Sequence, residues 1–193
     1  MIGCRDRGHV DKPLTVVTMA SSAPFQAIVA SARRLAFQRG HSQVGTEHLL
    51  FQIGCDSPEA LPKGLSFSEV RDFIKSAPFF KAIQVKLHVS SLYLSTSLQA
   101  VVKLAAELAV DSPARPSHLV AAILLFPRCI ARHVLETLSD GSVTARSYAS
   151  DIGARLKILM PAVTKNLEDR AAAIQKKVTP ACPWTSGVVP AGE

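Results

Sequence analysis

The stretch Val44-Gly45-Thr46-Glu47-His48-Leu49-Leu50 decides the fold expected for this 193-residue chain. It follows an apolar helical pattern that ends at Gly40, a residue suited to the left-handed backbone at a helix C-terminus. Together they predict a helix, a tight loop and a second helix that ends at about Ile53. Thr46 is expected to cap the second helix, and Glu47 to stabilise the positive end of its dipole.

The same pattern returns in weaker form as Pro116-Ser117-His118-Leu119-Val120, where His118 takes the place of His48 at an offset of 70 residues (118 − 48). At this fixed offset, without a gap, apolar positions fall mostly on apolar positions. The pairs are Ile28 with Leu98, Ala32 with Val102, Leu35 with Ala105, Ala36 with Ala106, Leu49 with Leu119, Ile53 with Ile123, and the basic Arg33 with Lys103. The chain is therefore predicted to contain two copies of one helical unit.

The segment from Phe25 to Ile53 resembles the first repeat of the Clp amino-terminal domain, the helical module that precedes the ATPase rings of Clp-type unfoldases. The string from Gly40 to Leu50 is similar to that family's most recognisable sequence. The second half resembles the second repeat, with Ser117-His118-Leu119-Val120 in place of Thr-Glu-His-Leu-Leu. The resemblance covers roughly Phe25 to Tyr148. It implies an all-α fold of two pseudo-repeats of about four helices each, packed as one domain, and a further C-terminal helix is expected.

The chain is expected to divide into a folded double repeat and less ordered ends. The predicted parts are a flexible segment at 1–22, the repeat domain at 23–158 with repeats at about 25–76 and 95–146, an extra helix at 161–178 and a disordered tail at 179–193. Whether Met1 or Met19 is the true start stays open. Ile83 to Val89 alternates like a strand, but an extended connection packed across the repeats is favoured because a lone strand has no evident partner.

Helix starts and apolar stripes can be assigned separately from the repeat. Capping side chains are expected at Ser22, Thr46, Ser66 with Glu69 in a capping box, Ser95 or Thr96, and Ser117. The first helix of each repeat has a stripe of apolar residues: Phe25, Ile28, Val29, Ala32, Leu35 and Ala36 in one, and Leu98, Val101, Val102, Ala105, Leu108 and Ala109 in the other. Cys55 to Gly64 is irregular, Pro127 interrupts the helical pattern before Leu138, and a further helix is expected from Ser142 to about Leu159.

Composition excludes several classes of protein. Hydrophobic residues make up 48% and charged residues 19% of the chain, as in an ordinary globular protein. The net charge is +7, and residues 77–158 contribute +4 of it, from nine basic and five acidic side chains. No GxxxxGK[ST] motif occurs, so no nucleotide-phosphate loop is expected. The four cysteines form no CxxC pair, which argues against zinc and indicates reduced thiols in an intracellular compartment.

The motif loop is the candidate binding site. The predicted ligand- or peptide-binding residues are Gln43, Val44, Thr46, Glu47 and Ser117. Glu47 can be read as a helix-end acid; the resemblance adds that in some Clp amino-terminal domains this Glu helps to bind phosphorylated arginine. Ser117 stands at the equivalent place in repeat two, so at most one such site is expected. His48 and His118 are expected to be structural, and no catalytic residue, cofactor or metal is predicted.

The favoured function is a non-enzymatic, free-standing protein-binding module that recruits substrates or adaptors to a Clp protease, or modulates it. Its expected partners are Clp ATPase or protease subunits and adaptor or substrate proteins. The alternative is a helical nucleic-acid-binding regulator that uses the basic second repeat. Nucleic acid is the less favoured partner, and no membrane partner is expected. The expected location is the cytoplasm, with a plastid or other organelle matrix as the alternative.

Overall fold

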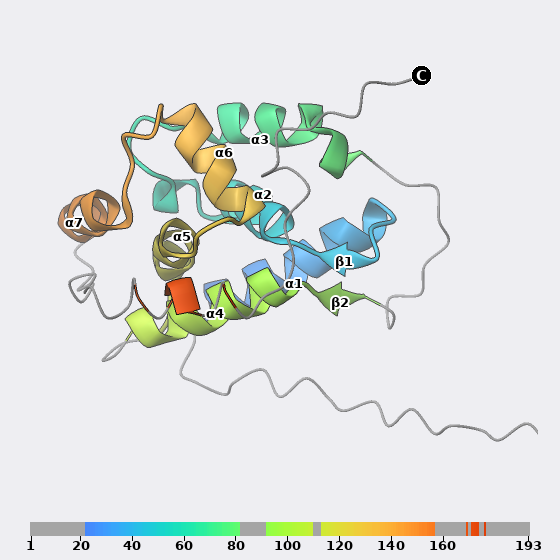
Figure 1. Cartoon of the computed structure of the whole chain (residues 1–193), viewed down its shortest axis with the longest axis horizontal. Coiled ribbons are helices and arrows are strands. Elements are labelled where there is room, and N and C mark those ends of the chain that lie inside the picture. Colours follow the sequence, from blue (N-terminus) through green and yellow to red (C-terminus); the bar gives the residue numbers. More distant parts are fainter. Residues whose placement is uncertain are drawn as a thin grey trace, which may run out of the picture.

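The computed structural model describes residues 22–81, 92–109, 113–156, 169, 171–173 and 176 and is all-α, as predicted (Figure 1). The described α-helices are α1 (Ala23–Gln38), α2 (Thr46–Asp56), α3 (Phe67–Ser76), α4 (Thr96–Leu108), α5 (Pro116–Leu125), α6 (Ile130–Leu138) and α7 (Ala145–Leu156). Two 3-10 turns, η1 (Pro58–Ala60) and η2 (Pro78–Phe80), flank α3. Two short strands, β1 (Gln43–Val44) and β2 (Tyr93–Leu94), pair in parallel.

Two similar sets of elements make up the domain. Repeat one contains α1, α2, η1 and α3, and repeat two contains α4, α5, α6 and α7. The packing is matched: α1 lies on α2 as α4 lies on α5, and α2 contacts α3 as α5 contacts α7. Across the two repeats, α2 packs against α6 while α5 packs against η1. The 3-10 turn η1 therefore takes the place in repeat one that α6 has in repeat two. The third helix of repeat one is reduced to this single turn, in agreement with the irregular structure predicted there.

The single offset of 70 residues is wrong for the first helix of each repeat. Ser22 and Ser95 are the N-caps of α1 and α4, so these helices correspond at an offset of 73 (95 − 22). At that offset buried residues pair: Phe25 with Leu98, Ile28 with Val101, Ala32 with Ala105, and Ala36 with Ala109. The second helices keep the offset of 70, because α4 has 13 residues where α1 has 16. A shift of three residues is nearly one helical turn, so apolar positions still met apolar ones in the wrong alignment.

Backbone hydrogen bonds join the two repeats in an exchanged pattern. The Ser95 N–H donates to the Val44 carbonyl at 3.0 Å, and the Ser22 N–H donates to the Ala114 carbonyl at 3.0 Å. Each repeat thus ties the start of its first helix to the residues that precede the other repeat's second helix. The extended connection expected between the repeats is seen at its described end, where β2 pairs with β1. The alternating segment from Ile83 to Val89 lies outside the described residues.

The core is continuous across both repeats and is centred on α2 and α5, which lie between α1 and α4 on one side and α3 and α6 on the other (Figure 1). Leu49 of α2 and Leu119 of α5 have no exposed surface. Every residue from Ser117 to Leu125 is buried. No single helix in the described ranges is long and apolar enough to cross a membrane; α5 and α6 together meet that test by length and composition only, with a 90° bend between them.

Most of the predicted helix ends are found, with local corrections. Gly40 has φ +72°, as expected after α1. Ser66 and Glu69 form the predicted capping box, and the Leu98 N–H donates to Ser95 Oγ at 3.1 Å. The Ser22 hydroxyl, expected to cap α1, instead donates to the Ala114 carbonyl at 2.7 Å.

The end of α2 and the start of α7 also differ from the expected boundaries. Helix α2 continues to Asp56, three residues beyond the expected end (56 − 53). Helix α7 begins at Ala145 instead of Ser142. Its first turn is capped by Thr144, whose Oγ1 accepts from the Ser147 N–H at 3.1 Å.

Some predictions concern residues outside this description. The N-terminal segment up to residue 21 and the tail at 179–193 are not described. Of the extra helix expected at 161–178, only residues 169, 171–173 and 176 are described; they are helical, and Ala171 is buried. The predicted domain boundaries at both ends therefore stay predictions.

Candidate functional site

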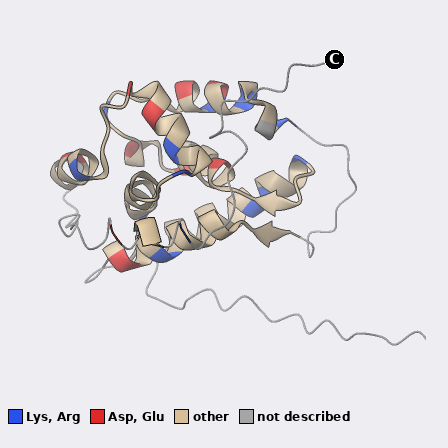
Figure 2. Ribbon diagram, viewed as in Figure 1, with Lys and Arg blue, Asp and Glu red and all other residues tan. Residues whose placement is uncertain are grey.

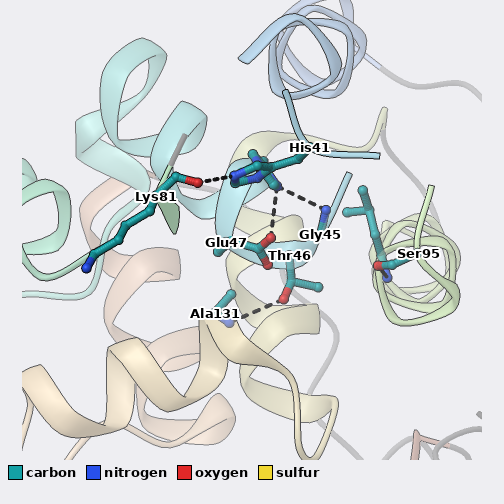
Figure 3. Close-up of polar contacts among 9 residues, drawn as sticks. His41, Gly45, Thr46, Glu47, Lys81, Ser95 and Ala131 are labelled. Atoms are coloured by element: carbon teal, nitrogen blue, oxygen red, sulfur yellow. Dashed lines mark hydrogen bonds and ion pairs between the residues drawn. The ribbon is translucent and has the colours of Figure 1, made fainter. Parts of the chain in front are cut away.

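The loop between α1 and α2 carries the first part of the motif, and α2 begins one residue earlier than the motif suggested. Gly45, in an extended conformation, is the N-cap of α2, so the prediction that Thr46 caps this helix is wrong. Thr46 Oγ1 instead accepts a hydrogen bond of 3.2 Å from the Ala131 N–H, in the first turn of α6 (Figure 3). Cys129, the N-cap of α6, forms no side-chain cap. Thr46 therefore caps a helix of the other repeat.

The predicted binding residues are brought together only in part. Gln43, Val44, Thr46 and Glu47 surround the start of α2, whereas Ser117 lies at the start of α5. Among them only Gln43 is exposed. The other four are buried: Val44, Thr46, Glu47 and Ser117 have 0%, 2%, 7% and 1% of their surface exposed. Their role in ligand binding stays a prediction, and Glu47 has the most solvent contact of the four buried residues.

A chain of polar contacts runs from Glu47 through two histidines to the end of η2 (Figure 3). Glu47 Oε1 lies 2.9 Å from His48 Nδ1, which is also 3.1 Å from the Gly45 backbone nitrogen. His48 Nε2 lies 2.8 Å from His41 Nδ1. His41 Nε2 in turn lies 2.9 Å from the Lys81 carbonyl oxygen. These contacts tie the residue after η2 to the start of α2.

Aromatic packing surrounds the same histidines. Phe80, in η2, has no exposed surface, and its ring centroid lies 6.0 Å from that of His41 and 5.3 Å from that of His48. It also stacks on Phe51 at 5.6 Å. The Arg39 guanidinium lies 4.9 Å from the Phe80 ring centroid, a cation–π distance. The start of the connection between the repeats is thus held by a buried side chain and by a backbone carbonyl.

Gly45 has a steric reason to be glycine. The Glu47 carboxylate folds back against this residue, so that a Cβ atom on Gly45 would overlap both carboxylate oxygens. A side chain there would force Glu47 away from its present position. The geometry of the polar chain therefore depends on the glycine that precedes α2.

The start of α5 has an equivalent histidine, His118, but lacks the chain of polar contacts seen at the start of α2. His118 Nδ1 accepts from the Arg115 N–H at 3.0 Å. Within the described ranges, His118 Nε2 and Ser117 Oγ are buried and have no hydrogen-bond partner. Burial, helped by the Arg115 charge, lowers the pKa of His118 from 6.5 to about 4. This ring is therefore neutral at neutral pH.

Two predictions about these residues can be decided here. Both histidines form hydrogen bonds at the starts of their helices, as the structural role predicted for His48 and His118 requires. The prediction that Ser117 caps α5 is wrong, because the N-cap is Arg115 and Ser117 already lies inside the helix.

Sequence reasoning missed His41, Phe80 and Lys81, although His41 lies in the motif string itself. The sequence signal that could have pointed to this region is the pair of consecutive phenylalanines, Phe79-Phe80, directly after Pro78 at the start of the connection. In the part of the chain that the structure describes, no group of three or more His, Cys, Asp or Glu side chains is placed to hold a metal ion. The two described cysteines are free thiols: Cys55 is exposed, and burial raises the pKa of Cys129 to about 11.

The chain, with its two four-element repeats, has the fold of a Clp amino-terminal domain. Among solved structures, the chain is similar to the crystal structure of the N-terminal domain of the caseinolytic protease associated chaperone ClpD from Arabidopsis thaliana. The two share 18% sequence identity with a TM-score of 0.54, over 75% of this chain and 99% of that one. At this identity the similarity establishes the fold alone. No family model and no curated protein matches the chain.

Proposed function

We propose that this chain is a non-enzymatic protein-binding module that recruits substrates or adaptors to a Clp protease, or modulates it. The observation that supports the proposal is the fold, which covers 99% of the N-terminal domain of a chaperone named for its association with the caseinolytic protease. A fold alone does not establish a function. The surface of the motif loop supplies the argument at the level of residues.

The proposed contact surface is the outer side of the β1–β2 ladder. Tyr93 has 64% of its surface exposed. In the described part of the chain two large hydrophobic residues are exposed, and Tyr93 is the more exposed of them. It pairs in register with Gln43, the one exposed residue of the predicted site. Aromatic side chains are enriched in protein interfaces because they bury a large area with little loss of conformational freedom. Tyr93 and Gln43 are therefore the residues through which we expect a partner protein to be bound.

The Glu47 carboxylate is proposed as a second, more selective part of this site. It retains 9% of its side-chain exposure, beside the amides at the start of α2. A guanidinium or phosphoarginine group on a partner would have to compete with His48 for that carboxylate. Ser117 occupies the equivalent place in repeat two, so such binding would be one-sided.

Affinity capture tests the proposal. The full chain is immobilised beside Tyr93→Ala and Thr137→Ala, the latter an exposed position on α6 that serves as the matched control. Native lysate is passed over each, and retained Clp ATPase and protease subunits are quantified. The parent and Thr137→Ala should retain these subunits, and Tyr93→Ala should retain less. Retention of no Clp component by the parent would contradict the proposal.

The nucleic-acid alternative has no specific observation in its favour. Basic side chains are spread over α1, α3, α4, α6 and α7, with acidic residues between them, and form no single dense surface in the described part of the chain (Figure 2). Arg132 of the second repeat is paired with Glu136 at 2.7 Å. A salt titration of DNA binding separates the two functions, because phosphate contacts give a steep dependence of affinity on salt.

A further inference from the structure

Charge is distributed unevenly between the two outer layers of the domain. Residues 22–46 and 92–106 form α1, the β1–β2 ladder and most of α4, and they include four cations and no aspartate or glutamate. The cations are Arg33, Arg34, Arg39 and Lys103. In the opposite layer, α3 and α6 carry side chains of both signs, and each helix contains an arginine–carboxylate ion pair. The α1–α4 layer is therefore the positive side of the domain.

The arginines of α1 and its C-cap are not neutralised by a carboxylate. Arg34 is exposed, and its Nη2 donates to the neutral Ser31 hydroxyl at 2.8 Å. Arg39 lies over the Phe80 ring, and none of the arginines at 33, 34 and 39 forms an ion pair within the described chain. The acid that follows β1, Glu47, is buried, with its carboxylate against Gly45 and His48. This positive charge is therefore available to a partner.

The exposed aromatic residues lie in the same layer. In the described part of the chain, the two exposed large hydrophobic residues are Phe37, near the end of α1, and Tyr93, in β2. Helix α1 contacts β1, and β1 pairs with β2, so these three elements are adjacent (Figure 1). Phe37 follows Arg33 by four residues and Arg34 by three, the spacings at which side chains are neighbours on a helix. Apolar contact area and positive charge thus occur together.

These two properties define the chemistry of a matching partner. A guanidinium binds a carboxylate with two parallel hydrogen bonds, and an exposed aromatic ring gains most from an apolar side chain that covers it. Opposite charge also speeds the encounter of two proteins. A second copy of the chain is a poor match, because it carries the same net charge of +7. A nucleic acid would require a denser cluster of Lys and Arg.

We propose that the C-terminal half of α1 and the β1–β2 ladder bind an acidic segment of the partner protein, in which aspartate or glutamate residues flank an aromatic or aliphatic side chain. The residues of this α1–ladder surface are Arg33, Arg34, Phe37, Gln43 and Tyr93. The apolar side chain packs on Phe37 and Tyr93, and the arginines bind the carboxylates. The inference rests on the proposed function for the kind of partner, a protein, and adds the charge of the segment that is recognised.

The test is an NMR titration of the full chain, with nitrogen-15 in the backbone amides, against three synthetic peptides. The first is Asp-Glu-Phe-Leu-Glu-Asp, the second replaces its acids by Lys and Arg, and the third replaces Phe-Leu by Ser-Ser. The first peptide should shift the amides of residues 33–43 and 93–95, and the other two should bind about tenfold more weakly or not at all. Binding of the first should weaken as salt rises from about 0.05 M to about 0.3 M, because screening shortens the range of surface charges.

Two charge-reversal variants show whether the effect is local. Arg34→Glu replaces an attraction by a repulsion and should weaken the first peptide by about tenfold. Arg146→Glu, at an exposed position in the first turn of α7, changes the net charge by the same amount and should bind like the parent. An acid in that turn suits the helix dipole, so the control is expected to fold. Equal weakening in both variants, or no shift of these amides by the first peptide, overturns the proposal.

The same variants separate this inference from the proposed function. In affinity capture from native lysate, Arg34→Glu should retain less Clp ATPase or protease subunit than Arg146→Glu. Equal retention by both overturns this inference and leaves the proposed function standing. Peptide binding at the α1–ladder surface without retention of any Clp subunit supports this inference and contradicts the proposed function. A DNA duplex that shifts the same amides more strongly than the peptide, or shifts that grow with protein concentration alone, overturn it in favour of nucleic acid or a second copy.

Discussion

His48 and His118 occupy the same position, the third residue of the second helix in their repeats, yet their surroundings differ. Each ring places Nδ1 close to the backbone nitrogen ahead of its helix, at 3.1 Å in repeat one and 3.0 Å in repeat two. His48 also contacts the Glu47 carboxylate and the His41 ring, whereas His118 Nε2 has no partner among the described residues. A duplicated helix start can therefore keep one backbone contact while the neighbouring residues decide which further contacts the ring makes.

The largest effect is expected where the two repeats are alike. Leu49→Ala and Leu119→Ala should each lower the free energy of unfolding by about 2–4 kcal/mol, because each removes a fully buried side chain from the centre of its repeat. Chemical denaturation of both variants measures this. A variant that unfolds like the parent would show that its repeat does not contribute to the common core.

Low pH should destabilise the fold through the neutral histidine of repeat two, His118. Because the pKa of His118 is lowered to about 4, the unfolded chain binds more protons than the folded one between that pH and 6.5. Stability from this residue is complete above pH 6.5 and is lost as pH falls, by up to about 3 kcal/mol. Unfolding free energies at about pH 7 and about pH 4.5 measure the loss, and His118→Gln should reduce it. An equal loss in parent and variant would assign the acid sensitivity to other groups.

Ligand binding should also separate the repeats. If Glu47 binds a cationic or phosphoarginine group, Glu47→Ala should weaken that ligand by about 1–3 kcal/mol, the worth of a charged hydrogen bond. Ser117→Ala should leave the affinity unchanged. Calorimetry with phosphoarginine and with an arginine-bearing peptide measures both. If the parent does not bind, or if both variants lose affinity equally, Glu47 is only a helix-end acid.

The smallest effects concern two hydroxyls at the starts of α2 and α5. Thr46→Ala should cost about 1–2 kcal/mol, because it leaves the buried Ala131 N–H of α6 without its acceptor. Ser117→Ala should change stability by less than about 0.5 kcal/mol, since its hydroxyl forms no hydrogen bond within the described chain. Thermal unfolding of both variants under one condition tests the difference. Equal losses would mean that Thr46 does not act as a cap across the repeats.

The fold could be predicted because its signals are local. The motif loop, the Ser66–Glu69 capping box and the apolar stripes of α1 and α4 each lie within a few residues, and the structure confirms them. Corresponding residues of the two stripes, which were identified separately, are already 73 positions apart in the sequence (98 − 25). The gap-free alignment hid this because a helix presents almost the same face after three residues.

The site could be predicted only in part, because its decisive contacts are distant in sequence. Thr46 caps a helix 85 residues away, and His41 contacts a carbonyl 40 residues away. No sequence pattern around Thr46 distinguishes a residue that caps its own helix from one that caps another. The burial of Glu47 likewise depends on elements distant in sequence, such as α6, that pack against α2, and the motif does not encode this packing.

The exchanged bonds from Ser95 to Val44 and from Ser22 to Ala114 have the form of a contact between two identical subunits. In a symmetric homodimer every substitution appears twice, so both binding positions must change together. Here the two halves of the contact belong to one polypeptide and are free to diverge. Repeat one can keep Glu47 and the contact between His48 and His41 while repeat two carries Ser117 and a neutral ring, which two copies of a single gene product could not achieve.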